Sequence, residues 1–203
     1  MDELNARFVA DCAGLDFLNS GDPSKEGDAD WLGTGEGFLI WLEHAQLVPL
    51  EVLRRMRFEF EAPTFDKVAS RARNLREWLR EFLKNRCRSP SLGFELSELQ
   101  MLNEVLGDDE VYYRVVASTP HDSVPALQPV RRWTAPESLI YPVAEAVARL
   151  ICVVDFGQIR HCERCGLTFV DRTRRQVRRW CSMTTCGNRA KQAAHRSRRK
   201  PSI

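Results

Sequence analysis

The sequence has no hydrophobic run long enough to cross a membrane. The most apolar stretch, residues 140–154, is interrupted by Pro142, Glu145 and Arg149, whereas a spanning helix needs about 18 to 20 apolar residues. The chain opens with Met-Asp-Glu and lacks the basic segment followed by an apolar one that marks a secretory signal peptide. We therefore expect a cytoplasmic protein without a membrane span.

Recognisable catalytic motifs are also missing. The chain contains only four histidines, and none belongs to a Ser/His/Asp pattern. It has no glycine-rich loop of the kind that holds phosphate groups. The grouped acids at residues 108–110 are more typical of a turn than of a catalytic pair. We therefore expect that the protein is not an enzyme.

The charge of the chain is divided unevenly along its length. The whole sequence has 30 Lys and Arg against 28 Asp and Glu, a net charge of +2. Residues 156–203 hold 13 basic and 2 acidic residues, a net charge of +11, and residues 1–155 have a net charge of −9. This division predicts an acidic body with a basic arm. Nucleic acid is the favoured partner of such an arm, and an anionic membrane surface is the alternative.

Hydrophobic periodicity predicts a mainly helical domain over the first 155 residues, with a small β element. Residues 8–19 fit a helix or a strand equally well, and residues 21–37 are typical of a loop. Two β-branched stretches, 111–117 and 127–133, predict a hairpin. Helices are expected at residues 38–45, 50–58, 65–87, 97–106 (capped by Ser97) and 139–154 (with a kink at Pro142).

Four of the seven cysteines form two closely spaced pairs, Cys162-x2-Cys165 and Cys181-x4-Cys186. Four thiolates complete a closed tetrahedral zinc shell, which has structural use but leaves no open position for catalysis. A thiol redox pair is less favoured, because no thioredoxin-like βαβ pattern surrounds the cysteines. An iron–sulfur centre is a further alternative.

The sequence around the cysteines predicts a small finger of the treble-clef or zinc-ribbon type. Gly166 permits the positive φ that a zinc-binding turn needs. We expect residues 156–160 to be a short junction, residues 167–170 to form a strand, and residues 178–180 to be the strand that returns beside it. An Ala- and Arg-rich helix should follow from residue 187. His161 and His195 are alternative zinc ligands.

The finger contains many residues suited to binding phosphate. Arginine is favoured there because its planar guanidinium group makes two parallel hydrogen bonds. A solvated basic surface without a partner is the competing interpretation. Asn188 also fits a role in bracing the metal turn, and Arg189 could instead pair with Asp171. The candidate nucleic-acid contacts are Arg172, Arg174, Arg175, Arg178, Arg179, Asn188, Arg189, Lys191, Arg196 and Arg199.

Residues 179–191, Arg-Trp-Cys-Ser-Met-Thr-Thr-Cys-Gly-Asn-Arg-Ala-Lys, closely resemble the CGNR zinc-finger family. Residues 15–20 resemble the opening motif of the ABATE domain that precedes such fingers, and residues 75–77 fit its central helix. That domain is described as a "putative stress-induced transcription regulator". The resemblance implies zinc at all four cysteines, binding to DNA or RNA, an ABATE-like domain over residues 1–155 and a finger over residues 156–203.

Together, these features predict an α+β protein, mainly α, with a helical N-terminal domain and a four-cysteine finger that holds structural Zn²⁺. We predict a zinc-dependent nucleic-acid-binding protein in transcriptional control, with DNA favoured over RNA and an N-terminal sensor or interaction domain. A protein–protein adaptor with a purely structural finger is the alternative. Asp16 and Asn19 are candidate contacts for a small-molecule effector, although hydrogen bonds within the fold are the more typical use of such residues. A homodimer stays a hypothesis, because no heptad seam supports one.

Overall fold

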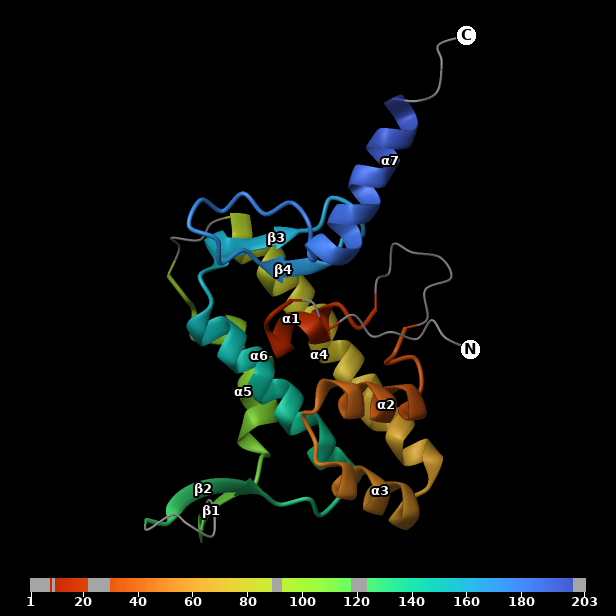
Figure 1. Cartoon of the computed structure of the whole chain (residues 1–203). Coiled ribbons are helices and arrows are strands. Elements are labelled where there is room, and N and C mark those ends of the chain that lie inside the picture. Colours follow the sequence, from red (N-terminus) through yellow and green to blue (C-terminus); the bar gives the residue numbers. More distant parts are fainter. Residues whose placement is uncertain (1–7, 9, 22–29, 89–92, 118–123, 199–203) are drawn as a thin grey trace.

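The computed structural model describes residues 8, 10–21, 30–88, 93–117 and 124–198. The predicted contact Arg199 and residues 22–29 of the expected loop at residues 21–37 lie outside these ranges. Figure 1 shows a helical body with one small hairpin at each end and a C-terminal helix that projects from the body. Among the described helices, none has both the length and the apolar composition that a membrane crossing requires.

Helices form most of the N-terminal domain, and the longest of them, α4, runs through its whole length (Figure 1). The shorter helices α1 and α2 pack on α6 and α4, respectively. The elements are α1 (Ala13–Leu18), α2 (Gly35–Ala45), α3 (Leu50–Glu59), α4 (Ala62–Arg88), α5 (Gln100–Gly107), β1 (Val111–Val116), β2 (Ala126–Arg131) and α6 (Tyr141–Val153), with 3-10 turns at Leu96–Leu99 and Pro136–Ile140.

The core of this domain is continuous from α1 to α6. Phe17, Phe38 and Trp41 are almost fully buried in it, as are the residues of one stripe of α4. Gly14 lets α1 approach α6 closely, since a Cβ atom at this position would lie 2.8 Å from the carbonyl oxygen of Ala146. The ambiguous stretch at residues 8–19 therefore contains a short helix, which is held by tertiary packing.

The predicted helices and hairpin are present, with corrections at their ends. β1 and β2 pair in antiparallel fashion, as expected. Pro142 lies in the first turn of α6 and produces no kink. A backbone N–H group in the first turn has no acceptor within the helix, so the N–H that proline lacks is not missed there. The expected cap Ser97 is replaced by Glu95, which forms a capping box with Glu98: the backbone N–H of each residue donates to the side-chain carboxylate of the other.

A charged cluster fastens the chain after α1 to the middle of α4. The guanidinium group of Arg76 is only 4% exposed and donates hydrogen bonds of 2.7 Å to each carboxylate oxygen of Asp30. It also donates to the hydroxyl of Ser20 at 3.0 Å. Because a buried guanidinium group needs a partner, this pair fixes the position of the segment that leads into α2.

The C-terminal part begins directly after α6. A 3-10 turn at Phe156–Gln158 leads into β3 (Ile159–His161), which pairs in antiparallel fashion with β4 (Thr168–Val170). A five-residue turn at Met183–Gly187 then leads into α7 (Asn188–Arg198). The expected strand at residues 178–180 is wrong, and the short junction expected at residues 156–160 ends earlier, because residues 159 and 160 belong to β3. The partner of β4 precedes the first cysteine pair, because that pair itself forms the turn of the hairpin.

Candidate metal centre and basic surface

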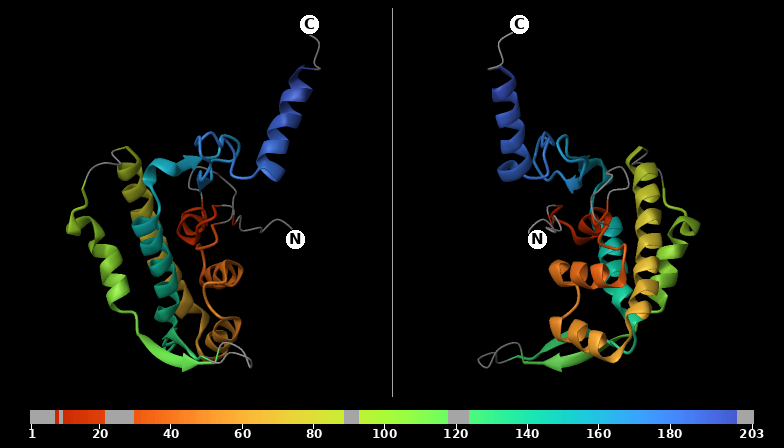
Figure 2. Two further views of the ribbon diagram at one scale, coloured as in Figure 1. Left: turned by 60° about the vertical axis from the view of Figure 1, so that its left-hand side comes forward. Right: turned by 90° about the vertical axis from the view of Figure 1, so that its right-hand side faces the viewer.

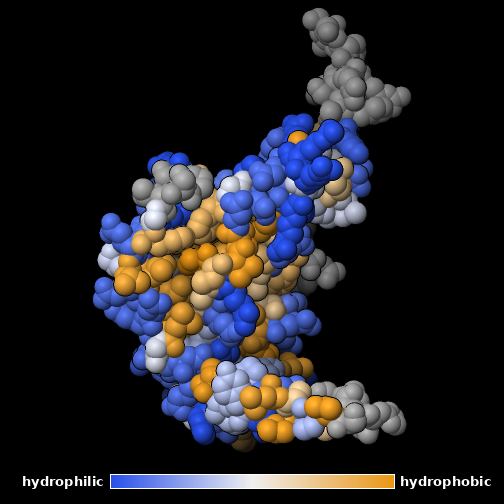
Figure 3. All heavy atoms as spheres, turned by 90° about the vertical axis from the view of Figure 1, so that its left-hand side faces the viewer, coloured by the Kyte–Doolittle hydropathy of each residue, from blue (hydrophilic) through white to orange (hydrophobic). Residues whose placement is uncertain are grey.

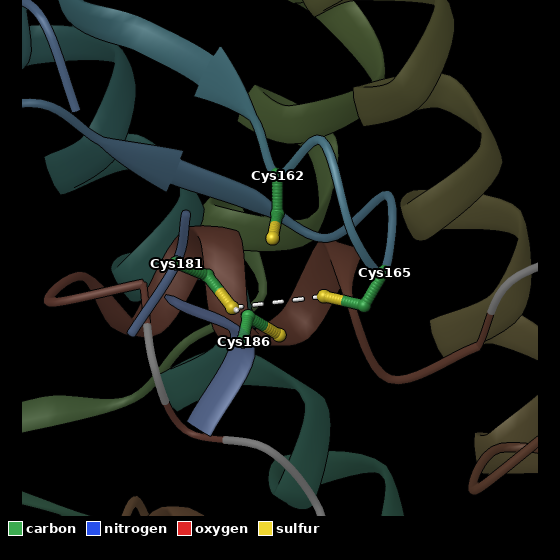
Figure 4. A group of neighbouring side chains, drawn as sticks. All are labelled: Cys162, Cys165, Cys181 and Cys186. Atoms are coloured by element: carbon green, nitrogen blue, oxygen red, sulfur yellow. Dashed lines mark hydrogen bonds between the residues drawn. The ribbon is translucent and has the colours of Figure 1, made fainter. Parts of the chain in front are cut away.

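The four paired cysteines converge on one point, although they come from separate segments (Figure 4). Their sulfur atoms all lie within 4.8 Å of one another, and three of the four residues are buried. Sulfur–sulfur distances are 3.6 Å for Cys165 and Cys181 and 3.7 Å for Cys181 and Cys186. A tetrahedral zinc ion with Zn–S bonds of about 2.3 Å needs edges of about 3.8 Å. The cluster therefore fits a closed zinc–thiolate site.

The first ligand pair lies in the turn of the β3–β4 hairpin. The backbone N–H of Cys162 donates to Leu167 and that of Gly166 donates back to Cys162, both at 2.9 Å. Gly166 has φ 76°, as its place after the second cysteine predicted. A side chain would be strained there, so glycine allows the turn to bring both thiols to one side.

The second ligand pair spans the turn that starts α7. The N–H of Gly187 donates to the carbonyl of Ser182 at 2.9 Å and closes this turn around Cys186. The side chain of Asn188 donates to the carbonyl of Thr184 at 3.1 Å, which is the bracing role expected for it. One residue therefore connects the metal turn to the first turn of α7.

The thiols differ in how readily they ionise. Burial opposes ionisation of Cys162, but the backbone N–H groups of Cys181, Arg164 and Cys165 lower the pKa of its thiol to about 6. For Cys181, burial and the neighbouring thiols act in the same direction and raise the pKa. Burial also raises the pKa of Cys165. A cation among these sulfurs would favour all the thiolates, since metal ligands bind deprotonated.

Asp171 organises the loop between the two ligand pairs. Its carboxylate is fully buried and accepts hydrogen bonds from the N–H and hydroxyl of Thr173, at 2.9 and 2.6 Å, and from the N–H of Arg178 at 2.9 Å. Burial opposes its charge, but these hydrogen bonds and the nearby Arg160 guanidinium group hold the pKa below its ordinary value. The considered pair between Asp171 and Arg189 does not form, and Arg189 is exposed.

Arg178 makes its main contacts within the finger, not with solvent. Its guanidinium group donates to the carbonyl of Trp180 at 3.0 Å and to the carbonyl of the ligand Cys181. It also lies 4.7 Å from the centre of the buried Phe169 ring. Sequence reasoning missed this role of Arg178, which holds the segment that carries a metal ligand.

The other side chains predicted to contact nucleic acid differ in whether they already have a partner within the protein. Arg179 pairs with Glu163, with an Nε–oxygen distance of 2.7 Å, and lies over the ring of Trp180. The remaining contacts that the structure describes are exposed, either in the loop after β4 or on α7, which points away from the body in both views of Figure 2. These exposed residues are Arg172, Arg174, Arg175, Asn188, Arg189, Lys191 and Arg196.

The two candidate effector contacts lie in the N-terminal domain. Asp16 accepts a hydrogen bond from the N–H of Ala10 at 3.1 Å. The side-chain amide of Asn19 donates to the carbonyl of Thr168 at 2.8 Å and accepts from its N–H at 2.9 Å. Asn19 therefore links α1 to the finger. Of the alternative metal ligands, His161 bonds to the Thr168 hydroxyl at 3.2 Å, and the His195 side chain is outside the described residues.

Two known families match separate parts of the chain. Residues 12–153 match the ABATE family, whose description is "Putative stress-induced transcription regulator". Residues 158–199 match the CGNR zinc finger. The chain therefore belongs to the ABATE family and carries a CGNR zinc finger after that domain, as its motifs predicted. A search of curated proteins finds no match.

Proposed function

We propose that this protein binds nucleic acid through its zinc-stabilised finger and acts in transcriptional control, with duplex DNA favoured over RNA. The main support for this proposal is α7, which projects from the body (Figures 1 and 2). This helix has 11 residues, and none of them is acidic. Arg189, Lys191 and Arg196 are exposed on it. An isolated basic helix of this kind is open to a polyanion along its length.

The spacing of these cations suits the geometry of a duplex. Arg189 and Arg196 are seven residues apart and so lie on one face of α7. The helix is about 16 Å long, and the major groove of B-DNA, about 12 Å wide, admits one α-helix. Arg172, Arg174 and Arg175 lie in the loop at the same end of the molecule as α7 (Figure 1) and can contact phosphates beside the groove.

Zinc binding should stabilise the turn from which the basic helix α7 begins. The finger is too small to be held by hydrophobic burial alone, so metal binding supplies part of its folding free energy. Cys186 lies in the turn directly before α7, and Asn188 ties that turn to the helix. Loss of zinc releases the start of α7 and should therefore weaken binding to nucleic acid.

A charge-removal experiment tests the role of α7. The double variant Arg189→Ala/Arg196→Ala is compared with Arg54→Ala, which removes an exposed arginine from α3. Binding to a labelled DNA duplex is measured by fluorescence anisotropy at several salt concentrations. Each lost phosphate contact should reduce the slope of log K against log salt by about 0.9. An unchanged slope in the α7 variant, with zinc content intact, contradicts the proposal.

The adaptor alternative is favoured by a different surface. Tyr113, Val115 and Leu127 of the β1–β2 hairpin are each about two-thirds exposed. This hairpin lies at the lower end of the molecule, where Figure 3 shows apolar surface. Exposed apolar patches are typical of protein interfaces. Competition among duplex DNA, RNA and an acidic protein for the labelled full-length protein distinguishes the two functions, because an adaptor should prefer the acidic protein.

A further inference from the structure

A cavity of about 490 Å³ lies between the N-terminal domain and the finger. One wall is the C-terminal half of α4 with the end of α1, and the opposite wall is formed by β3 and the turn that carries the first cysteine pair. This volume is typical of small-molecule sites, which occur preferentially between domains. The Asn19–Thr168 hydrogen bonds lie at the edge of this cavity and hold its two walls together.

The cavity has an apolar floor and a cationic rim. Leu83 of α4 and Ile159 and Leu167 of the finger border it, and each is at least nine-tenths buried. Lys84 and Arg88 lie on the rim, one turn apart on the same face of α4. None of the described residues that line the cavity is acidic.

The cationic side chains that line the cavity differ in how firmly their neighbours hold them. Arg80 donates to the carbonyl of Gly21 at 3.0 Å and pairs with Glu77, so its position is fixed. Lys84 forms an exposed pair with Glu81 at 3.2 Å, which an incoming anion can replace because exposed pairs are weak. His161 faces the same cavity from β3.

We propose that this cavity binds a small organic anion, with its apolar body on the floor and its carboxylate or similar group at Lys84 and Arg88. A ligand in this place contacts both walls and therefore stabilises the docking of the finger on the N-terminal domain. The site names a class of ligand for the sensor role that the sequence predicted for the N-terminal domain, and in this respect it rests on the proposed function. Its test contains no nucleic acid, so the failure of one proposal can be told from the failure of the other.

The first measurement is calorimetric titration of the zinc-loaded full-length protein. The rigid anion 2-naphthoate is compared with 2-naphthylmethanol and 2-naphthylmethylammonium, which have the same ring system and no negative charge. Decanoate serves as a flexible anion. The naphthoate should bind at least about tenfold more tightly than the alcohol, because charge-assisted hydrogen bonds replace neutral ones. The variant Lys84→Ala/Arg88→Ala should lose this preference.

The matched control is Lys67→Ala, which removes an exposed lysine from the same helix but away from the cavity. This variant should keep the preference for the anion. No binding of either anion, equal binding of the three naphthyl compounds, or equal losses in the control and the rim variant would each overturn the proposal.

Cysteine alkylation then locates the bound ligand. Cys87 lines the cavity, whereas Cys152 is exposed outside it. Alkylation by iodoacetamide, followed by mass spectrometry, is measured with and without 2-naphthoate. The ligand should slow the reaction at Cys87 several-fold and leave Cys152 unchanged. Binding that protects neither cysteine, or both equally, places the ligand elsewhere and overturns the assignment of this site.

Discussion

Asn19 and Thr168 are 149 residues apart in the sequence and form a pair of hydrogen bonds through the side-chain amide of one and the backbone of the other. Asn19 follows α1 in the N-terminal domain, and Thr168 begins the second strand of the finger hairpin. The carboxamide both donates and accepts, so it satisfies both backbone groups of Thr168 at once. This contact makes the finger part of the body and defines one edge of the cavity between them.

Replacing Asn19 should therefore destabilise the contact between the two parts. We expect Asn19→Ala to lower the free energy of unfolding by about 1–3 kcal/mol, since it leaves partly buried backbone groups of Thr168 without a partner. Urea denaturation of the zinc-loaded protein measures this change. Asn103→Ala, at an exposed position on α5, is the matched control and should have almost no effect. Equal stability of both variants would show that the pair contributes nothing.

The Asp30–Arg76 pair should make stability depend on pH at the acidic end. Burial opposes the charge of Asp30, but hydrogen bonds from Arg76 and from the N–H of Leu32 lower its pKa below the ordinary 3.8. A lowered carboxyl pKa stabilises the fold above the ordinary value, and this contribution disappears as the pH falls through the folded-state pKa. Asp30→Asn should cost about 2 kcal/mol at pH 7, less than a fully buried pair because Asp30 is 37% exposed.

Unfolding free energies of the wild-type protein and Asp30→Asn between pH 3 and pH 7 check this prediction. The difference between them should be largest at neutral pH and should shrink below about pH 4. A difference that grows on acidification has the wrong sign and would refute the assigned role. Comparing the two proteins at each pH cancels the effect of zinc loss, which both share.

Arg178 and Arg174 should separate support of the metal from contact with a partner. Arg178→Ala removes the donor to the carbonyl of Cys181 and should weaken zinc binding by about tenfold. Arg174→Ala changes an exposed side chain in the same loop and should leave zinc affinity unchanged while weakening DNA binding. Competition with a chromophoric chelator measures zinc affinity for both. If Arg174→Ala lowers zinc affinity as much as Arg178→Ala, the division of roles is wrong.

The four-cysteine site predicts one zinc ion per chain. Cys186→Ser should lose the metal, because three thiolates and a hydroxyl make a weaker shell, whereas Cys152→Ser should retain it. Atomic emission spectroscopy on purified protein gives the stoichiometry. Full zinc content in Cys186→Ser would mean that another group completes the shell.

Local sequence patterns carried most of the correct predictions. The apolar stripe on α4 is long and regular, so its expected range of 65–87 lies close to Ala62–Arg88. The convergence of the four cysteines was predicted because their spacing is typical of a closed metal site. In both cases the signal is contained in a short segment.

Predictions that needed information from distant segments were incomplete or wrong. Residues 178–180 were expected to form a strand, but the partner of β4 is β3, whose three residues are too few to show a period. The role of Asn19 depends on a strand 149 residues away, so no local pattern could reveal it. The internal use of Arg178 was hidden because a basic residue in a basic segment has the same composition signal whether it faces solvent or a carbonyl group.

A salt titration of DNA binding, with and without zinc, tests the central claim most directly. Zinc-loaded protein and chelator-treated protein are titrated against the same labelled duplex, and metal content is measured on each sample. The account predicts binding that weakens steeply with salt and is lost when zinc is removed. Stoichiometric zinc with no binding to DNA or to an RNA of equal length would contradict it, and the finger would then be a structural element only.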